Sequence, residues 1–210
     1  HHVIYSAFDV DKFRNANKSL ALNDSRIDIN LNNNPKVIVR LARFERLKRH
    51  KDLIETFSKI LHNFPNTILI LVGDGELLLE NKQLSKKLNL EKKIIFTGFV
   101  SYPEKIIALA DICVMNSERE ALSRAMIQYI AGGKPVICSN LFGVEEVIKD
   151  EINGCIFDQK DSKGLYKKLS LLLSNDEYLN KLTNGAKKTD VSYWSLEFMG
   201  KKINDLYNSV

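Results

Sequence analysis

The sequence has no apolar run near the roughly 20 residues that a membrane-spanning helix needs. Its first residues, HHVIYSAFDVDKF, are mixed and polar and do not resemble a secretory signal peptide. His1 and His2 are typical of the end of a purification tag, so we expect the natural start to lie further upstream. We expect a cytoplasmic protein, with peripheral association with the cytoplasmic face of a membrane left open.

Cysteine is scarce as well. Cys113, Cys138 and Cys155 each lie in a short apolar segment, and their spacings match no zinc-binding pattern. Because an odd number argues against a disulfide framework, we expect three small buried thiols in a reducing compartment. His50 and His62 are isolated in the sequence. We therefore predict no metal site and no cofactor.

The net charge of +5 comes mostly from lysine pairs in segments that are predicted to be helical. A solvated helix face is the simplest interpretation, and attraction to anionic lipid or to phosphorylated substrates is the functional alternative. The sequence contains no basic stripe interleaved with aromatic residues and no recognition motif, so nucleic acid is not an expected partner. The pairs are Lys86-Lys87, Lys92-Lys93, Lys167-Lys168, Lys187-Lys188 and Lys201-Lys202.

The chain has 210 residues, of which 44% are hydrophobic and 27% charged, as in an ordinary globular domain. From residue 35 onward, apolar runs alternate with segments of helical period. This alternation predicts an α/β fold, a Rossmann-like, doubly wound parallel sheet of about six strands flanked by helices. The predicted strands are 36–41, 67–72, 93–97, 111–115, 135–138 and 154–157, and the intervening helices are about 50–62, 76–89, 103–110, 122–131 and 143–149.

Three further helices are predicted after the last strand, at about 162–173, 176–187 and 194–208. Asp161, Asn175 and Ser192 are suitable residues to begin them. Residues 15–34 are polar and rich in asparagine, which predicts a linker or a mobile loop.

In a sheet of this kind, ligands bind in the crevice beyond the carboxyl ends of the strands. After the first strand, Arg43 and Lys48 flank a short turn, and two cations there would suit a diphosphate. A solvated basic loop is the alternative, since Arg40, Arg46 and Arg49 lie nearby.

Three more strand exits carry candidate residues. Gly73 and Gly75 follow the second strand and permit a tight turn or close approach of a ligand, although a plain turn explains them equally well. Val100 follows the third strand, where backbone groups could read a base or simply form an ordinary loop. After the fourth strand, a loop leads into a helix predicted to begin at Leu122, whose free N–H groups would favour an anion.

These motifs, in this order, resemble the C-terminal domain of family 4 glycosyltransferases, the retaining GT-B enzymes. VIYSAFDVDKF is similar to the family's interdomain segment, ARFERLK to its diphosphate-binding GRLxxxK element and SEREALS to its SxxEGxx motif. VGDGE and FTGFV match the VGDGP and FxGxV elements, and the likeness covers nearly the whole chain. It implies an interdomain segment and polar linker at 1–34, a Rossmann-like donor-binding domain at 35–192 and a C-terminal helix at 193–210.

The resemblance also implies roles for single residues. Arg43 and Lys48 would bind the diphosphate of a nucleotide sugar and stabilise the leaving group. A UDP-sugar is the expected donor. Glu120, the first acid of an E-x7-E motif, would lie near the hydroxyls of the donor sugar. The backbones of Leu122 and Ser123 would contact the phosphates and that of Val100 the base. Gly73 would also contact the donor, and Gln128 would occupy the position that faces the ribose.

The chain departs from the family pattern in two ways. The N-terminal domain that would bind the acceptor is absent, so we expect a fragment that is inactive alone, with a cell-surface polysaccharide or lipid-linked glycan as the parent enzyme's acceptor. Gln128 replaces the second acid of E-x7-E, so nucleotide binding should be weakened rather than abolished. The same Gln128 leaves open a non-catalytic donor-binding module or partner subunit.

Overall fold

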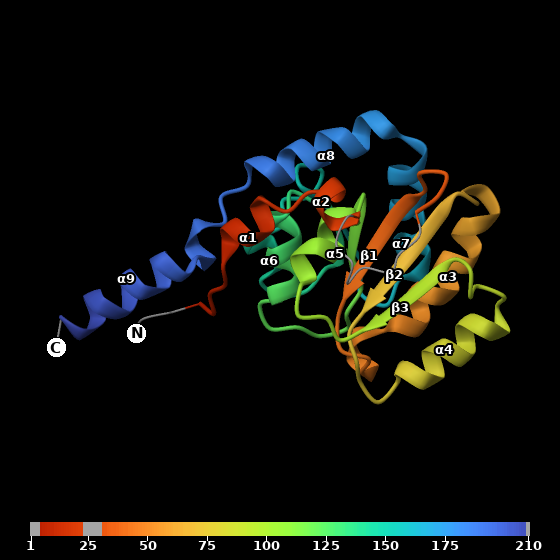
Figure 1. Ribbon diagram of the computed structural model, residues 1–210, viewed down its shortest axis with the longest axis horizontal. Coiled ribbons are helices and arrows are strands. Elements are labelled where there is room, and N and C mark those ends of the chain that lie inside the picture. The colour runs from red at the N-terminus through yellow and green to blue at the C-terminus, as the bar shows by residue number, and fades with distance from the viewer. Residues whose placement is uncertain (1–4, 23–30, 209–210) are drawn as a thin grey trace.

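A computed structural model describes residues 5–22 and 31–208 of the chain. The expectations for residues 1–4, and for 23–30 of the predicted linker, lie outside the described residues. Figure 1 shows a central sheet with helices on both faces and a last helix that extends away from this body.

The sheet has six parallel strands in the order β3-β2-β1-β4-β5-β6, which confirms the predicted fold class. Each strand lies where the apolar runs predicted, with ends shifted by about a residue in the middle strands. The order places β1 and β4 side by side at the centre, so the loops that follow them lie close together. The strands are β1 (Lys36–Leu41), β2 (Thr67–Val72), β3 (Ile94–Gly98), β4 (Ile112–Met115), β5 (Val136–Ser139) and β6 (Gly154–Phe157).

Alternate residues of each strand enter two different hydrophobic cores. In β1, Val37 and Val39 join the core that contains α5 and α6, whereas Ile38 joins the core that contains α3 and α7. This alternation is the two-residue period of a strand that is buried on both faces. The three cysteines are buried in β4, β5 and β6, as expected, and none of them forms a disulfide.

Seven longer helices follow the predicted pattern. They are α3 (His50–Asn63), α4 (Leu78–Lys87), α5 (Pro103–Leu109), α6 (Arg124–Ala131), α7 (Ser162–Ser174), α8 (Asp176–Lys188) and α9 (Leu196–Tyr207). The side chains of Asp161 and Asn175 cap α7 and α8, as predicted, by accepting bonds from the backbone N–H groups of Lys163 and Tyr178. None of the helices in the described part of the chain is long and apolar enough to cross a membrane.

Three predicted helix positions were wrong. Helix α6 begins at Arg124 rather than Leu122, because Ser123 is the extended cap residue. The segment 143–149 contains only a short 3-10 helix, Val144–Glu146, which follows Gly143 in the left-handed conformation. Ser192 opens another 3-10 helix, Ser192–Trp194, and Ser195 caps α9 instead, accepting a bond from the N–H of Phe198.

Two short helices lie near the start of the chain, α1 (Val10–Arg14) and α2 (Lys18–Leu22). Helix α2 falls within the predicted linker, and it packs against α5 with Ala21 buried. The polar composition of 15–34 concealed this contact. A 3-10 helix, η1 (Arg46–Lys48), follows β1 and was also not predicted.

Candidate functional site

A cleft of about 650 Å³ opens at the carboxyl end of the sheet. It lies between the exits of β1 and β2, the loop after β3 and the first turns of α6, where the strand-exit rule predicted a site. Of the predicted site residues, Arg43, Gly73, Val100 and Gln128 line it. The remaining lining residues are Leu41, Ala42, Val72, Asp74, Gly75, Phe99, Pro103 and Arg124.

Gly73 and Gly75 are required by the way the chain turns beside β1. A Cβ atom on Gly73 would lie 2.1 Å from the carbonyl oxygen of Ala42, and one on Gly75 would lie 2.7 Å from that of Phe44. Both residues also have positive φ angles, 136° and 149°. The glycines therefore let the loop after β2 lie directly against the loop after β1, which forms one wall of the cleft.

Arg43 lies on the open side of the cleft. Its side chain is 77% exposed, and its Nε pairs with Oε1 of Glu45 at 2.9 Å. An exposed pair of this kind contributes at most about 1 kcal/mol. Arg43 can therefore exchange Glu45 for an anionic ligand at little cost.

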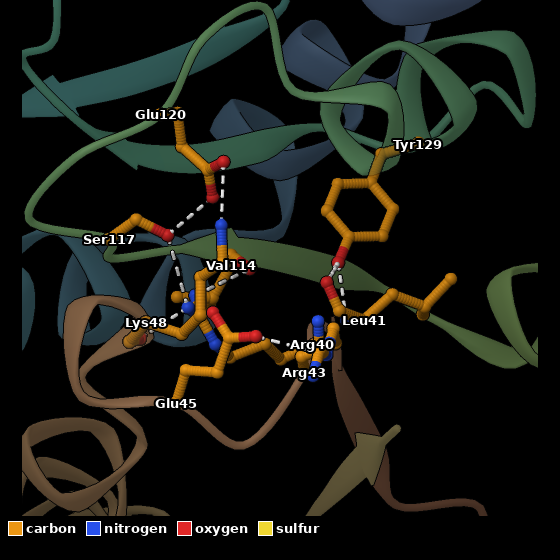
Figure 2. A network of polar contacts seen from close by, with 9 residues as sticks. All are labelled: Arg40, Leu41, Arg43, Glu45, Lys48, Val114, Ser117, Glu120 and Tyr129. Carbon is orange, nitrogen blue, oxygen red and sulfur yellow. Dashed lines mark hydrogen bonds and ion pairs between the residues drawn. The ribbon is translucent and has the colours of Figure 1, made fainter. Parts of the chain in front are cut away.

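Lys48 and Glu120 form an ion pair, with Nζ and Oε2 2.7 Å apart (Figure 2). The Lys48 side chain is 20% exposed and that of Glu120 14%. The second carboxylate oxygen of Glu120 accepts a hydrogen bond of 2.8 Å from the hydroxyl of Ser117. The fold thus brings two predicted site residues together across 72 positions in the chain, although neither lines the cleft itself.

Arg40 does not belong to a solvated basic loop, the alternative that the sequence left open for this region. It is 1% exposed. Its guanidinium donates to the carbonyl of Lys48, to that of Val114 at 3.4 Å and to the Ser117 hydroxyl at 3.3 Å. Burial lowers the pKa of Arg40 to about 10, so the side chain stays positively charged at neutral pH. A charged residue inside an otherwise apolar strand was the signal that could have revealed it.

Two hydrogen bonds to main-chain carbonyls also join the loop after β1 to the loop after β4. The N–H of Glu118 donates to the carbonyl of Leu47 at 2.8 Å, and the side-chain amide of Asn116 donates to the carbonyl of Arg49 at 2.9 Å. Arg49 adopts the left-handed conformation between η1 and α3. Lys48 is consequently held toward Glu120 by main-chain geometry as well as by charge.

Helix α6 is anchored to the end of β1 by Tyr129. The buried phenol oxygen accepts a hydrogen bond from the N–H of Leu41 at 2.5 Å and lies 3.5 Å from its carbonyl oxygen (Figure 2). Burial raises the pKa of Tyr129 well above its ordinary value. Since Gln128 precedes Tyr129, this anchor sets where Gln128 meets the cleft.

Arg124 is a second cation of the cleft that the predicted site did not include. It lies one helical turn before Gln128, so both side chains are on the same face of α6. Its guanidinium donates a hydrogen bond to the hydroxyl of Ser6. The position of an arginine in the first turn of a helix that faces the crevice was the available sequence signal.

Leu122 and Ser123 do not line the cleft. Leu122 is half-buried against the core, and Ser123 is the cap residue of α6, although its side chain makes no capping bond. Phe99 lines the cleft and is 80% exposed, a contribution that the sequence analysis did not anticipate. The described residues hold no group of three or more His, Cys, Asp or Glu that could bind a metal.

The family described as "Glycosyl transferases group 1" matches residues 23–189 of this chain. Among characterised relatives, the chain is 26% identical over 175 residues to N-acetyl-alpha-D-glucosaminyl L-malate synthase of Bacillus anthracis, covering 83% of this chain and 45% of the relative. It is also 26% identical over 208 residues to UDP-Gal:alpha-D-GlcNAc-diphosphoundecaprenol alpha-1,3-galactosyltransferase of Escherichia coli. That match covers 98% of this chain and 53% of the relative. The chain spans about half the length of these relatives.

Solved structures share the fold. The crystal structure of Anabaena HepE in complex with UDP and glucose superposes with a TM-score of 0.87 at 20% identity, covering all of this chain and 57% of HepE. The C-terminal domain of a glycosyl transferase group 1 family protein, LpcC from Francisella tularensis, gives a TM-score of 0.76 at 22% identity and is covered completely by 90% of this chain. The architecture is therefore that of one half of a GT-B protein.

Proposed function

Because this chain belongs to the glycosyl transferases group 1 family, we propose that it is the donor-binding half of a glycosyltransferase and that it binds a nucleotide diphosphate sugar, with UDP as the nucleotide. The observation that carries the proposal is the cleft at the carboxyl end of the sheet, with Arg43 and Arg124 on its walls. Lys48 and Glu120 form an ion pair between the loops that follow the central strands β1 and β4. The UDP complex of HepE, which has the same fold, supports the choice of nucleotide.

Arg43 and Lys48 would hold the diphosphate. Arg43 can offer a forked pair of donors, and Lys48 a compact charge that Glu120 already orients. Both charges would stabilise the nucleoside diphosphate as it leaves with growing negative charge. The backbone N–H groups of Leu122 and Ser123, next to the first turn of α6, would add to the same anion site.

The remaining residues would divide the rest of the donor between them. Glu120 would accept hydrogen bonds from hydroxyls of the donor sugar, and Gln128 would face the ribose. Gly73 would let the donor approach the backbone of the β2 exit loop, and the backbone of Val100 would contact the base. These assignments follow the family motif, and Gly73, Val100 and Gln128 also line the cleft.

For the whole protein, we propose retaining, metal-independent transfer in the cytoplasm to a cell-surface polysaccharide or lipid-linked glycan; peripheral association with the membrane stays an open alternative. An N-terminal half would supply the acceptor site, since the relatives are about twice as long as this chain. The isolated chain would then bind the donor without transferring sugar.

The replacement of an acid by Gln128 favours one alternative, a donor-binding subunit without turnover. The amide still offers an acceptor and a donor to a ribose but carries no charge. The alternative fails if the full-length protein transfers or hydrolyses sugar from a nucleotide donor. If it is correct, nucleotide binding persists and turnover is absent.

Calorimetry of the chain with UDP and GDP tests the proposal. We expect UDP to bind, and we expect Arg43→Ala and Lys48→Ala each to weaken binding by about 1.5–3 kcal/mol for the lost charged hydrogen bond. Arg46→Ala is the matched control, because Arg46 lies in the same 3-10 helix as Lys48 but does not line the cleft, as Arg43 does, and does not pair with Glu120, as Lys48 does. No detectable binding of either nucleotide at millimolar concentration would overturn the proposal.

Gln128 can be tested separately. If it faces the ribose, Gln128→Glu should tighten UDP binding by restoring a charged acceptor. Unchanged or weaker binding in this variant would remove Gln128 from the nucleotide site while leaving the diphosphate assignment intact.

A further inference from the structure

A second cavity, of about 480 Å³, lies at the amino ends of the strands, opposite to the cleft. Asp111 and Lys134, which lie just before β4 and β5, line it together with the C-terminal ends of α5 and α6. It shares no lining residue with the cleft. The two cavities are therefore separate, one at each end of the strands.

The charges around this second cavity are strongly unbalanced. Among the described residues that line it, Arg14, Lys18, Lys134 and Lys187 are cations, and Asp111 is the one acid. One oxygen of Asp111 already accepts a hydrogen bond of 2.7 Å from the N–H of Val37. The excess of positive charge makes an anion the complementary occupant.

Lys134 is held at the wall of the cavity by the end of α5. Its Nζ donates to the carbonyls of Ala108 at 3.0 Å and Ala110 at 2.7 Å, which leaves one of its three protons for another acceptor. Burial lowers the pKa of Lys134; Cys113 and Asp111 oppose this effect, and the charges of Lys18 and Lys187 add smaller contributions that lower it. These three ammonium groups thus act on one another, and an anion between them would relieve their repulsion.

Packing also directs the other lysines. A Cβ atom on Gly133 would lie 2.8 Å from Cγ of Lys187, so the stem of Lys187 passes directly over this glycine, whose φ angle is 67°. The Nζ of Lys18 donates to the side-chain oxygen of Asn34 at 3.4 Å. The fold therefore brings both lysines to the cavity.

Helix ends explain part of this pattern. Arg14 and Lys187 lie in the last turns of α1 and α8, and Lys134 binds the last carbonyls of α5, which are ordinary places for cations. Lys18 is the first residue of α2, where a cation gains nothing from the helix dipole. Helix ends also do not account for the convergence of all four charges on one cavity with a single acid.

We propose that this cavity binds the phosphate group of a small phosphorylated molecule. Its volume lies within the range of about 300–1,000 Å³ that is typical of small-molecule sites. Ammonium and guanidinium groups are the side chains that bind phosphate best. Helix α6 connects the two sites, since Gln128 lines the cleft and Ile130 lines the second cavity. The proposal does not depend on the nucleotide that the cleft binds.

Amide chemical shifts of the isotope-labelled 210-residue chain test the site directly, with inorganic phosphate and glycerol 3-phosphate as probes and with UDP present to occupy the cleft. We expect saturable shifts at Gly132, Gly133 and Thr183, and none of the same size with chloride at equal ionic strength. The amides of Gly73 and Gly75 report the cleft separately. A failure of UDP to bind would therefore be distinguished from a failure of the second site.

The variant Lys18→Gln/Lys187→Gln should weaken phosphate binding at least about tenfold, because each lost charged contact contributes more than a neutral hydrogen bond. Lys188→Gln is the matched control, since Lys188 follows Lys187 but does not line the cavity, and it should change the affinity less than about twofold. Equal effects of the two variants, or equal shifts with chloride, would overturn the proposal.

Vesicles distinguish the source of the phosphate. Sedimentation with vesicles that contain phosphatidic acid, but not with pure phosphatidylcholine, and its loss in Lys18→Gln/Lys187→Gln would identify a lipid headgroup. Binding of glycerol 3-phosphate without sedimentation would identify a soluble phosphate ester. Absence of both kinds of binding would refute the site.

Discussion

Replacing Glu120 with glutamine separates its effect on stability from its effect on the ligand. The side chain keeps its shape but loses the charge that lies 2.7 Å from Lys48. Exposed ion pairs contribute at most about 1 kcal/mol, whereas breaking a buried pair costs about 3–5 kcal/mol. With 20% and 14% of the two side chains exposed, this pair falls between these limits. We expect Glu120→Gln to lower the free energy of unfolding by about 1–3 kcal/mol.

The ligand should respond in the opposite direction. Under the proposed function, UDP brings two phosphates near Lys48, and removal of the Glu120 charge frees this lysine and removes a repulsion. Even at the dielectric of bulk water, one charge about 4 Å away changes the energy by roughly 1 kcal/mol, and the lower effective dielectric near a protein surface increases this, so UDP should bind at least about fivefold tighter. The affinity for a nucleotide sugar should increase less than that for UDP, because the sugar loses its proposed contact with the Glu120 carboxylate.

Urea denaturation with and without UDP, together with calorimetry, measures both effects. Glu118→Gln is the matched control, since Glu118 lies in the same loop but pairs with Arg49 and Lys160, whereas Glu120 pairs with Lys48. It should leave the affinity for UDP unchanged. If Glu120→Gln weakens UDP binding as much as Lys48→Ala does, the reasoning about the pair is refuted.

Two further predictions concern the scaffold of the site. His50 is buried against Phe44, and burial, with Arg40 and Lys48 adding to the effect, lowers its pKa to about 2. This folded-state pKa lies below the unfolded value of about 6.5, so the contribution of neutral His50 to the free energy of unfolding should be present above pH 6.5. It should fall by about 2 kcal/mol between pH 7 and pH 5, because the histidine of the unfolded chain takes up a proton and the buried one does not. Urea denaturation should show that part of the pH dependence vanish in His50→Leu; an unchanged slope would contradict it. Gly73→Ala should destabilise the protein by at least about 2–3 kcal/mol and abolish UDP binding, because the new Cβ meets the Ala42 carbonyl at 2.1 Å and φ is positive. Gly98→Ala, with positive φ but nothing within 4 Å, should cost only about 1 kcal/mol when both variants are compared by urea denaturation.

Local patterns in the sequence were enough to predict the sheet. The apolar runs of β1 to β6 lie within about a residue of their observed positions, because burial on both faces leaves a signal in consecutive residues. The strand-exit rule pointed to Arg43, Gly73 and Val100, and the family resemblance added Gln128; all four line one cleft. The wrong helix boundaries, such as the start of α6, depended on cap conformations that weak local preferences do not specify.

Only the tertiary structure decided which of these residues meet. Lys48 contacts Glu120 across 72 positions, Tyr129 reaches Leu41 across 88, and Asp111 reaches Val37 across 74. The sequence by itself determined the strands, most of the helices that follow them and the residue types at each strand exit. The pairing of Lys48 with Glu120, the burial of Arg40 and the convergence of cations on the second cavity depend on the order of strands in the sheet, because that order sets which distant loops become neighbours.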